Sequence, residues 1–149
     1  MSVFTSNEIA YLRSQPLGRF ATVGGDGRPS VRPVGVLFDA EDDVLVIGGV
    51  AGSGMAGSKK FRDVVGNPDV SFLVDDLASV DPWAPRGIEV RGRAEPRWGD
   101  GPAKGLALAA PFPFDEAWMV IRPRRVLSWG LDGDSFDLAA RTVTPAGRG

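Results

Sequence analysis

The stretch GRFATVGGDGRPSVRPVGVLFD, residues 18–39, has the pattern of a β-hairpin. Its first six and last ten residues are rich in β-branched and aromatic side chains, and three glycines lie within the four positions 24–27 between them. A glycine-rich turn between two such runs is typical of antiparallel strands. We therefore predict strands over residues 18–23 and 30–39, at the start of an antiparallel meander.

Outward from this hairpin, the hydrophobic pattern predicts mostly strands. Further strands are predicted over residues 44–47, 69–75, 86–95 and 118–129, and short helices over 6–14, 58–65 and 103–110. Thr5 and Glu8 have the spacing of a capping box, Ser58 is the expected N-cap of the second helix, and Pro123 predicts a bend or bulge in the last strand. Six strands with short peripheral helices suit a small closed barrel, because closure removes exposed sheet edges.

Composition limits the classes of function. The chain has 149 residues, 43% of them hydrophobic, and a formal net charge of −2. This length predicts one domain over residues 1–149, with a weakly ordered tail over 132–149. The near-neutral charge predicts no nucleic-acid partner and no membrane partner. The first residues lack the pattern of a signal peptide, and no apolar run approaches the length of a membrane span, so we expect a cytoplasmic protein.

The chain contains no cysteine and no histidine. This composition excludes disulfides, catalytic triads with histidine, and metal sites built on cysteine or histidine, and we predict no metal. Two acidic pairs, Asp75 with Asp76 and Asp132 with Asp134, are better explained by strand ends and turns than by carboxylate catalysis. We predict no catalytic side chain. A bound cofactor that supplies its own reactivity needs only binding and orientation from the protein.

One motif indicates a different fold. Residues 52–57, GSGMAG, match the glycine pattern of dinucleotide-binding loops, and Asp75 follows about 20 residues later. Three antiparallel strands precede this loop, however, and no alternating series of strands and long helices follows it. The loop also lacks the lysine directly after the last glycine that a phosphate-binding Walker loop requires. We therefore disfavour the dinucleotide-binding fold.

A basic cluster follows this loop. Lys59 and Lys60 fall in the first turn of the predicted helix, with Arg62 close behind. Cations are unfavourable there, because the helix dipole places positive charge at the N-terminus. A bound phosphate or carboxylate would reverse the sign of this interaction. The alternative is a solvated basic face paired with Asp63, and the residues alone leave both interpretations open.

A second unusual position lies within the opening hairpin. Pro33 interrupts the hydrogen bonding of its predicted strand and follows Arg32, while Gly35 has no side chain. Backbone of this kind either marks a bulge or lies against a flat ligand.

These segments together resemble a known family. The order of the motifs LGRFATV, GRPSVRPVG, SKKFRDV, NP, FLVDDLASVDPW, RGIEVRGRA and IRPRRVLSWG is similar to the deazaflavin-dependent branch of the pyridoxamine 5'-phosphate oxidase-like split barrels. The resemblance covers roughly residues 3–131, and the ordered series is more specific than any one motif. The segment 50–57 departs from the family pattern by being longer and richer in glycine.

The resemblance implies a mainly β, six-stranded split barrel that forms a homodimer with cofactor grooves between the protomers. The implied cofactor is the deazaflavin F420, with FMN as the alternative. The segment SKKxRD would hold its phosphate or acidic tail, and the segments around Arg32 and Gly48 would lie near its ring. The implied cofactor-binding residues are Arg32, Pro33, Val34, Gly35, Gly48, Gly49, Ser58, Lys59, Lys60, Arg62 and Trp83.

The family also implies an activity. We expect hydride transfer from reduced deazaflavin to the activated C=C bond of a small-molecule substrate, with a proton from water or a substrate hydroxyl. Some members look like terminal reductases of tetracycline-type pathways, and the sequence permits such a substrate. Trp83 and Trp129 are the expected substrate contacts, and Trp98, Phe112 and Phe114 are further candidates for an apolar wall. The alternatives are an FMN-dependent oxidase or flavin reductase, and a non-catalytic protein that binds a cofactor or tetrapyrrole.

Overall fold

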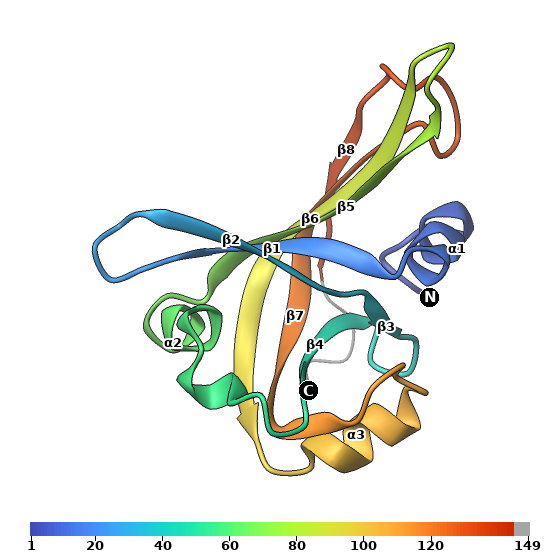
Figure 1. Ribbon diagram of the computed structural model, residues 1–149. Helices are drawn as coiled ribbons and strands as arrows, with labels where there is room; N and C mark the ends of the chain where they lie inside the picture. The colour runs from blue at the N-terminus through green and yellow to red at the C-terminus, as the bar shows by residue number, and fades with distance from the viewer. Residues whose placement is uncertain (145–149) are drawn as a thin grey trace.

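The computed structural model describes residues 1–144 as a strongly twisted antiparallel sheet with short helices around it (Figure 1). The strands are β1 (Leu17–Val23), β2 (Pro29–Gly35), β3 (Leu37–Asp39), β4 (Val44–Val50), β5 (Asp69–Ser79), β6 (Ala84–Trp98), β7 (Phe114–Trp129) and β8 (Ala139–Thr142). The helices are α1 (Ser6–Ser14), α2 (Lys59–Gly66) and α3 (Gly101–Ala107), with a 3-10 turn η1 (Met55–Gly57) before α2. None of the helices in the described part of the chain is both long and apolar enough to cross a membrane.

Hydrogen bonds join the strands in the order β2-β1-β5-β6-β7-β4-β3, and β8 pairs with β7. Every pairing is antiparallel. The mainly β fold with short peripheral helices is therefore confirmed, but the predicted count of six strands is too low. The two ends of the order, β2 and β3, do not pair with each other, so hydrogen bonding within residues 1–144 does not close the sheet.

The first extra strand arises within the predicted strand 30–39, which divides at Val36. β2 pairs with β1 up to Gly35, and β3 pairs with β4 from Leu37 onward. Between them, the Val36 N–H donates to the carbonyl of Pro16 at 3.3 Å. The strand divides because the chain leaves one end of the sheet and joins the other at this residue.

The second extra strand is β8, which lies in the segment for which the sequence predicted a weakly ordered tail. β4 covers one side of β7 only from Phe114 to Ile121, which leaves the far end of β7 as a free edge. β8 fills this edge by pairing with residues 125–128. An unpaired strand edge leaves backbone groups unsatisfied, so the pairing orders a segment whose composition predicted a loose tail. Residues 145–149, the last part of that predicted tail, lie outside the described residues.

The helix caps are confirmed. The Thr5 side chain accepts a hydrogen bond from the Glu8 N–H, and the Glu8 side chain accepts one from the Thr5 N–H. Ser58 caps α2 by accepting from the Phe61 N–H at 3.4 Å. The bulge predicted near Pro123 is also present: the β6–β7 register shifts so that Gly92 pairs with Pro123 while its neighbour Arg91 pairs with Arg125.

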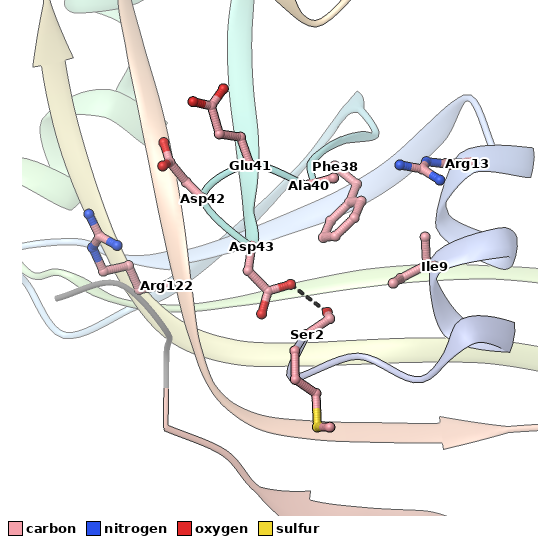
Figure 2. Close-up of a pocket in the computed structure, with 10 residues that line it drawn as sticks. Ser2, Ile9, Arg13, Phe38, Ala40, Glu41, Asp42, Asp43 and Arg122 are labelled. Carbon is pink, nitrogen blue, oxygen red and sulfur yellow. Dashed lines mark hydrogen bonds between the residues drawn. The ribbon is translucent and has the colours of Figure 1, made fainter.

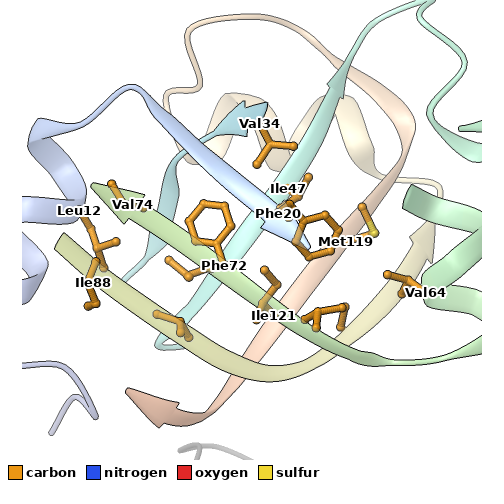
Figure 3. Close-up of a cluster of buried hydrophobic side chains, with 14 of the residues drawn as sticks. Leu12, Phe20, Val34, Ile47, Val64, Phe72, Val74, Ile88, Met119 and Ile121 are labelled. Carbon is orange, nitrogen blue, oxygen red and sulfur yellow. The ribbon is translucent and has the colours of Figure 1, made fainter. Parts of the chain in front are cut away.

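The core lies on the concave side of the sheet (Figure 3). Alternate residues of β1, β5, β6 and β7 point into it, as period-2 strands require. Fully buried members include Phe20, Phe72, Ile88, Met119 and Ile121. Burying each such side chain stabilises the fold by about 1.5–3 kcal/mol. Phe61 and Val64 attach α2 to this cluster, which holds the polar start of α2 at the rim of the sheet.

β5 and β6 are longer than predicted and project as a two-stranded arm (Figure 1). Asp75 and Asp76 therefore lie inside a strand and not at the expected strand end. Asp76 accepts two hydrogen bonds from Arg86, at 2.7 and 3.0 Å, and one from the Tyr11 hydroxyl at 2.8 Å. Asp76 and Arg86 therefore form a structural ion pair between β5 and β6, and the Tyr11 hydroxyl links this pair to α1.

Candidate functional site

The start of α2 lies beside the turn between β1 and β2, and its first lysine is engaged within the protomer. Lys59 Nζ lies 2.8 and 3.1 Å from the carboxylate oxygens of Asp63. Asp63 is buried and also accepts a hydrogen bond from the Thr22 hydroxyl at 2.8 Å. The hydrogen bond from Lys59 lowers the pKa of Asp63 against the opposing effect of burial. For Lys59, the interpretation as a cation paired with Asp63 is therefore the correct one.

The neighbouring cations are not paired. In residues 1–144, Lys60, Arg62 and Arg32 have no carboxylate within ion-pair distance. Lys60 is half-buried, and burial together with the positive charge of Arg32 lowers its pKa. The structure thus brings Lys60 of α2 and Arg32 of β2 together, as the predicted anion site requires. Two neighbouring cations without a counter-ion are unfavourable, and an anion between them would relieve the repulsion.

Backbone groups add to this positive region. The N–H groups of Lys59 and Lys60 are the first two of α2, and no acceptor for either is present in the described chain. The unsatisfied N–H groups and the helix dipole favour a phosphate or carboxylate at this end of the helix. Ser58 keeps its side chain for capping, donating to the Met55 carbonyl and accepting from Phe61.

β2 supplies the second wall of the candidate site. It is an end strand of the sheet, so Pro33 costs no hydrogen bond to a further strand, and Pro33 pairs with Arg19 of β1. Val34 is buried in the core beside this edge. Gly35 ends the strand, and a side chain there would lie 3.4 Å from the ring of Phe112. The predicted segment 32–35 therefore runs from the cation pair to an aromatic ring.

Gly48 and Gly49 lie in β4, but the space over them is already filled. A Cβ on Gly48 would lie 2.3 Å from the ring of Phe114, and one on Gly49 would lie 2.9 Å from the Cβ of Met55. The lack of side chains here lets the protein pack against its own residues. Contacts of these two glycines with a cofactor stay a prediction.

The glycine-rich loop before α2 binds a carboxylate of the protein itself. Gly54 and Met55 donate backbone N–H bonds of 3.1 and 3.0 Å to Asp115. The backbone hydrogen bond from Met55 is the main reason that the pKa of Asp115 is lowered. Gly52 and Gly54 adopt positive φ angles that place their N–H groups toward Asp115. The pattern that resembles a dinucleotide loop is thus used internally, and the sheet order excludes the parallel fold that such a loop serves.

The predicted aromatic wall does not form within one protomer. Trp83 is exposed at the tip of the β5–β6 arm, and Trp129 lies over Gly87 within the arm. Trp98 contacts Phe61 of α2 edge to face at 5.2 Å, and Phe112 stacks on Phe114 at 5.7 Å. β5 starts next to α2 and extends for 11 residues, roughly 35 Å, toward the arm tip. Trp83 therefore cannot reach the cations of its own α2 (Figure 1).

Sequence reasoning missed the pockets around the end of α1. A pocket of about 530 Å³ lies between α1 and the β3–β4 turn, and Arg13, Phe38, Glu41 and Asp42 are among its lining residues (Figure 2). A second of about 380 Å³ is lined by Arg13, Gly35 and Phe112, and a third of about 360 Å³ by Leu106, Phe112 and Pro113. Arg13 gave no sequence signal, because a cation in the last turn of a helix is ordinary.

The fold can now be compared with known proteins. A family model described as pyridoxamine 5'-phosphate oxidase matches residues 6–130. The chain belongs to this family. The match includes β1, β2 and the start of α2, which carry the cation pair, together with the β5–β6 arm.

Within the pyridoxamine 5'-phosphate oxidase family, the chain is similar to the 5a,11a-dehydrotetracycline/5a,11a-dehydrooxytetracycline reductase of Streptomyces rimosus subsp. rimosus. The two are 39% identical over 142 residues, which cover 95% of this chain and 94% of the relative. A solved structure of an F420 reductase is 25% identical, with a TM-score of 0.61 over 83% of this chain and 98% of that one. A heme binding protein from Mycobacterium smegmatis shares the fold at 21% identity and a TM-score of 0.67; the match covers 95% of this chain and 60% of that one.

The residues fit a phosphorylated flavin-type cofactor of the kind this family binds. Lys60, Arg62 and Arg32 supply positive charge and form no ion pair within residues 1–144, and the start of α2 supplies free N–H donors. The adjoining strand β2 is exposed from Val31 to Pro33 and ends at Gly35.

Proposed function

We propose that this protein is an F420-dependent reductase that saturates an activated C=C bond in a tetracycline-type polyketide. The observation that carries the proposal is the 39% identity to a dehydrotetracycline reductase over nearly the full length of both chains. The similarity to an F420 reductase structure supports the cofactor. When bound, the reduced deazaflavin would supply a hydride, with the proton coming from water or a substrate hydroxyl.

The protein's own residues then bind and orient the cofactor. Lys60, Arg62 and the N–H groups at the start of α2 hold the acidic part of the cofactor, and Arg32 faces it from β2. Lys59 acts indirectly, because its bond to Asp63 fixes the first turn of α2 against Thr22 of β1. The edge of β2 from Pro33 to Gly35 lies along the uncharged part of the cofactor.

F420 is preferred over FMN on the basis of charge. FMN carries one phosphate, whereas F420 carries a phosphodiester and a tail of carboxylates. Three cations that form no ion pair within residues 1–144 match an extended acidic ligand better than a single phosphate. The absence of histidine and cysteine also favours a cofactor whose hydride chemistry needs no side-chain acid or thiol.

A homodimer completes this proposal. Trp83 lies at the tip of the arm, about 59% exposed, far from the α2 of its own protomer. Leu77 and Val80 are exposed on the same arm. A second copy would cover this apolar surface and could bring its Trp83 to the cofactor groove.

The deciding experiment is titration of the purified protein with reduced and oxidised F420 beside FMN, followed by turnover with 5a,11a-dehydrotetracycline. We expect F420 to bind more tightly, and reduced F420 to be consumed only with the substrate and without peroxide in air. Cofactor deuterated at carbon 5 should leave one deuterium on carbon in the product. Peroxide formation with FMN would support the oxidase, and tight cofactor binding without turnover would support a binding protein.

A further inference from the structure

The pocket of about 380 Å³ at the end of β2 carries positive charge alone. It is formed by Arg13 in the last turn of α1, by Gln15 and Pro16 after α1, by Gly35 and Leu37 at the β2–β3 junction, and by Phe112 before β7. Arg13 is the one charged residue in this lining, and in residues 1–144 it has no ion-pair partner. Its guanidinium lies 5.5 Å from the centre of the Phe38 ring (Figure 2).

The two adjoining pockets differ in chemistry. The pocket that shares Phe112 is lined by Leu106, Ala110 and prolines, with no charged residue. The pocket that shares Arg13 adds three acidic residues, Glu41, Asp42 and Asp43, and one further cation, Arg122, so its charge is less favourable to an anion. A ligand with one acidic group and a flat apolar body therefore fits from Arg13 across Phe112, and not toward Asp42.

The position of this pocket relates it to the cofactor site. Gly35 is three residues beyond Arg32 along the extended strand β2, a distance of about 10 Å. A cofactor held by its acidic part at Arg32 and Lys60, with its ring along β2, would end beside Gly35. The ring of Phe112 lies against Gly35, where an added Cβ would be 3.4 Å from it. The pocket thus lies where the reaction partner of the ring must be.

We infer that this pocket is the substrate site, and that Arg13 selects a planar polycyclic substrate by pairing with an ionised enol or carboxylate oxygen. The inference rests on the proposed function for the direction of the cofactor. It goes beyond that function by assigning a residue of α1 to substrate recognition. Arg is suited to this role because its planar group is attracted to the nearby Phe38 ring and can bond to two oxygens in one plane.

The test separates substrate binding from cofactor binding. Tetracycline, which has the 5a,11a bond saturated, is titrated into the full protein, and F420 is titrated separately. Arg13→Gln should weaken tetracycline binding roughly 10-fold or more, Arg13→Lys less, and Phe112→Leu measurably, all with unchanged F420 affinity. Arg93→Gln removes an exposed cation outside these pockets, and Glu41→Gln alters only the acidic pocket. Both controls should bind tetracycline like the wild type.

Wild-type affinity in Arg13→Gln and Phe112→Leu would overturn the inference, as would a wild-type protein that binds no tetracycline. Weaker binding in Glu41→Gln with none lost in Phe112→Leu would place the ligand in the acidic pocket and also overturn it. Loss of F420 binding or turnover in the wild type is a different result. It would contradict the proposed function, while the tetracycline titrations would still decide the role of Arg13.

Discussion

Arg141, three residues from the end of the described chain, binds the buried carboxylate of Glu8 with both ends of its guanidinium. The two hydrogen bonds measure 2.6 and 2.9 Å and join residues 133 positions apart in sequence. Arg141 also donates to the Val3 carbonyl at 2.6 Å. Strand β8 thereby ties the start of the chain and α1 to the far end of β7.

The first prediction concerns this ion pair. Arg141→Ala should lower the free energy of unfolding by about 2–4 kcal/mol, because it leaves the buried Glu8 charge with neutral donors, the Thr5 N–H and the Ser128 side chain, in place of a cation. Urea unfolding monitored by tryptophan fluorescence measures the loss. Arg125→Ala is the matched control, since Arg125 contacts only the Thr142 hydroxyl on the same strand pair and should cost less than about 1 kcal/mol. Equal losses of unfolding free energy in the two variants would contradict a stabilising role for the Glu8–Arg141 ion pair.

The second prediction is a pH dependence from the same pair. Burial would raise the pKa of Glu8, but the hydrogen bonds from Arg141 and the Thr5 N–H outweigh it and lower the pKa below its ordinary value of 4.5. A lowered pKa means that the ionised group stabilises the fold above about pH 4.5, and that this contribution is lost as pH falls through the folded value. The stability gap between wild type and Glu8→Gln should therefore shrink between pH 6 and pH 3, and a constant gap would refute this.

The third prediction separates the adjacent cations of α2. Lys60→Ala and Arg62→Ala should each weaken cofactor binding by about 1–3 kcal/mol, the scale of a charge-assisted hydrogen bond, without changing the fold. Lys59→Ala should mainly lower stability, because it leaves Asp63 with Thr22 as its remaining hydrogen-bond donor. Calorimetric titration with F420 compares the cofactor affinities of the three variants, and thermal melts compare their stabilities. Unchanged affinity in both Lys60→Ala and Arg62→Ala would rule out the anion site.

A fourth prediction concerns packing at Gly48. Gly48→Ala should destabilise the fold by about 1–3 kcal/mol, because the new Cβ would overlap the ring of Phe114 and that ring has little room to move. Gly57→Ala is the control, since a Cβ there meets no atom within 4 Å and its φ is not positive. If both variants melt like the wild type, the ring of Phe114 yields easily and Gly48 is not needed for packing.

The fifth prediction concerns assembly. Light scattering should give a mass near twice the 15.8 kDa of one chain, and dilution should weaken dimerisation and cofactor binding together. Trp83→Ala should reduce cofactor affinity even though the arm tip is remote from the α2 of its own protomer. A monomer that keeps full affinity, or a Trp83→Ala variant that binds normally, would show that each protomer contains a complete site.

The sequence by itself determined the local elements and the family. Turn residues, caps and alternating side chains act over a few positions, so the opening hairpin, α1 and α2 were predictable. The unfavourable charges at Lys60 and Arg62 also raised an anion site as one of two interpretations, because the helix dipole acts within the first turn and depends only on neighbouring residues.

Only the tertiary structure decided which of these groups remain available to bind a ligand, because hydrogen bonding and burial depend on contacts between distant residues. The sequence left Lys59 as a candidate for the anion site, and the fold pairs it with Asp63. It showed a glycine pattern at residues 52–57 whose context disfavoured a dinucleotide loop, and the fold shows the use of this loop, because Gly54 and Met55 bind Asp115. Strand β8 and the Glu8–Arg141 pair could not be predicted from local pattern, since they exist only because β4 leaves the end of β7 uncovered.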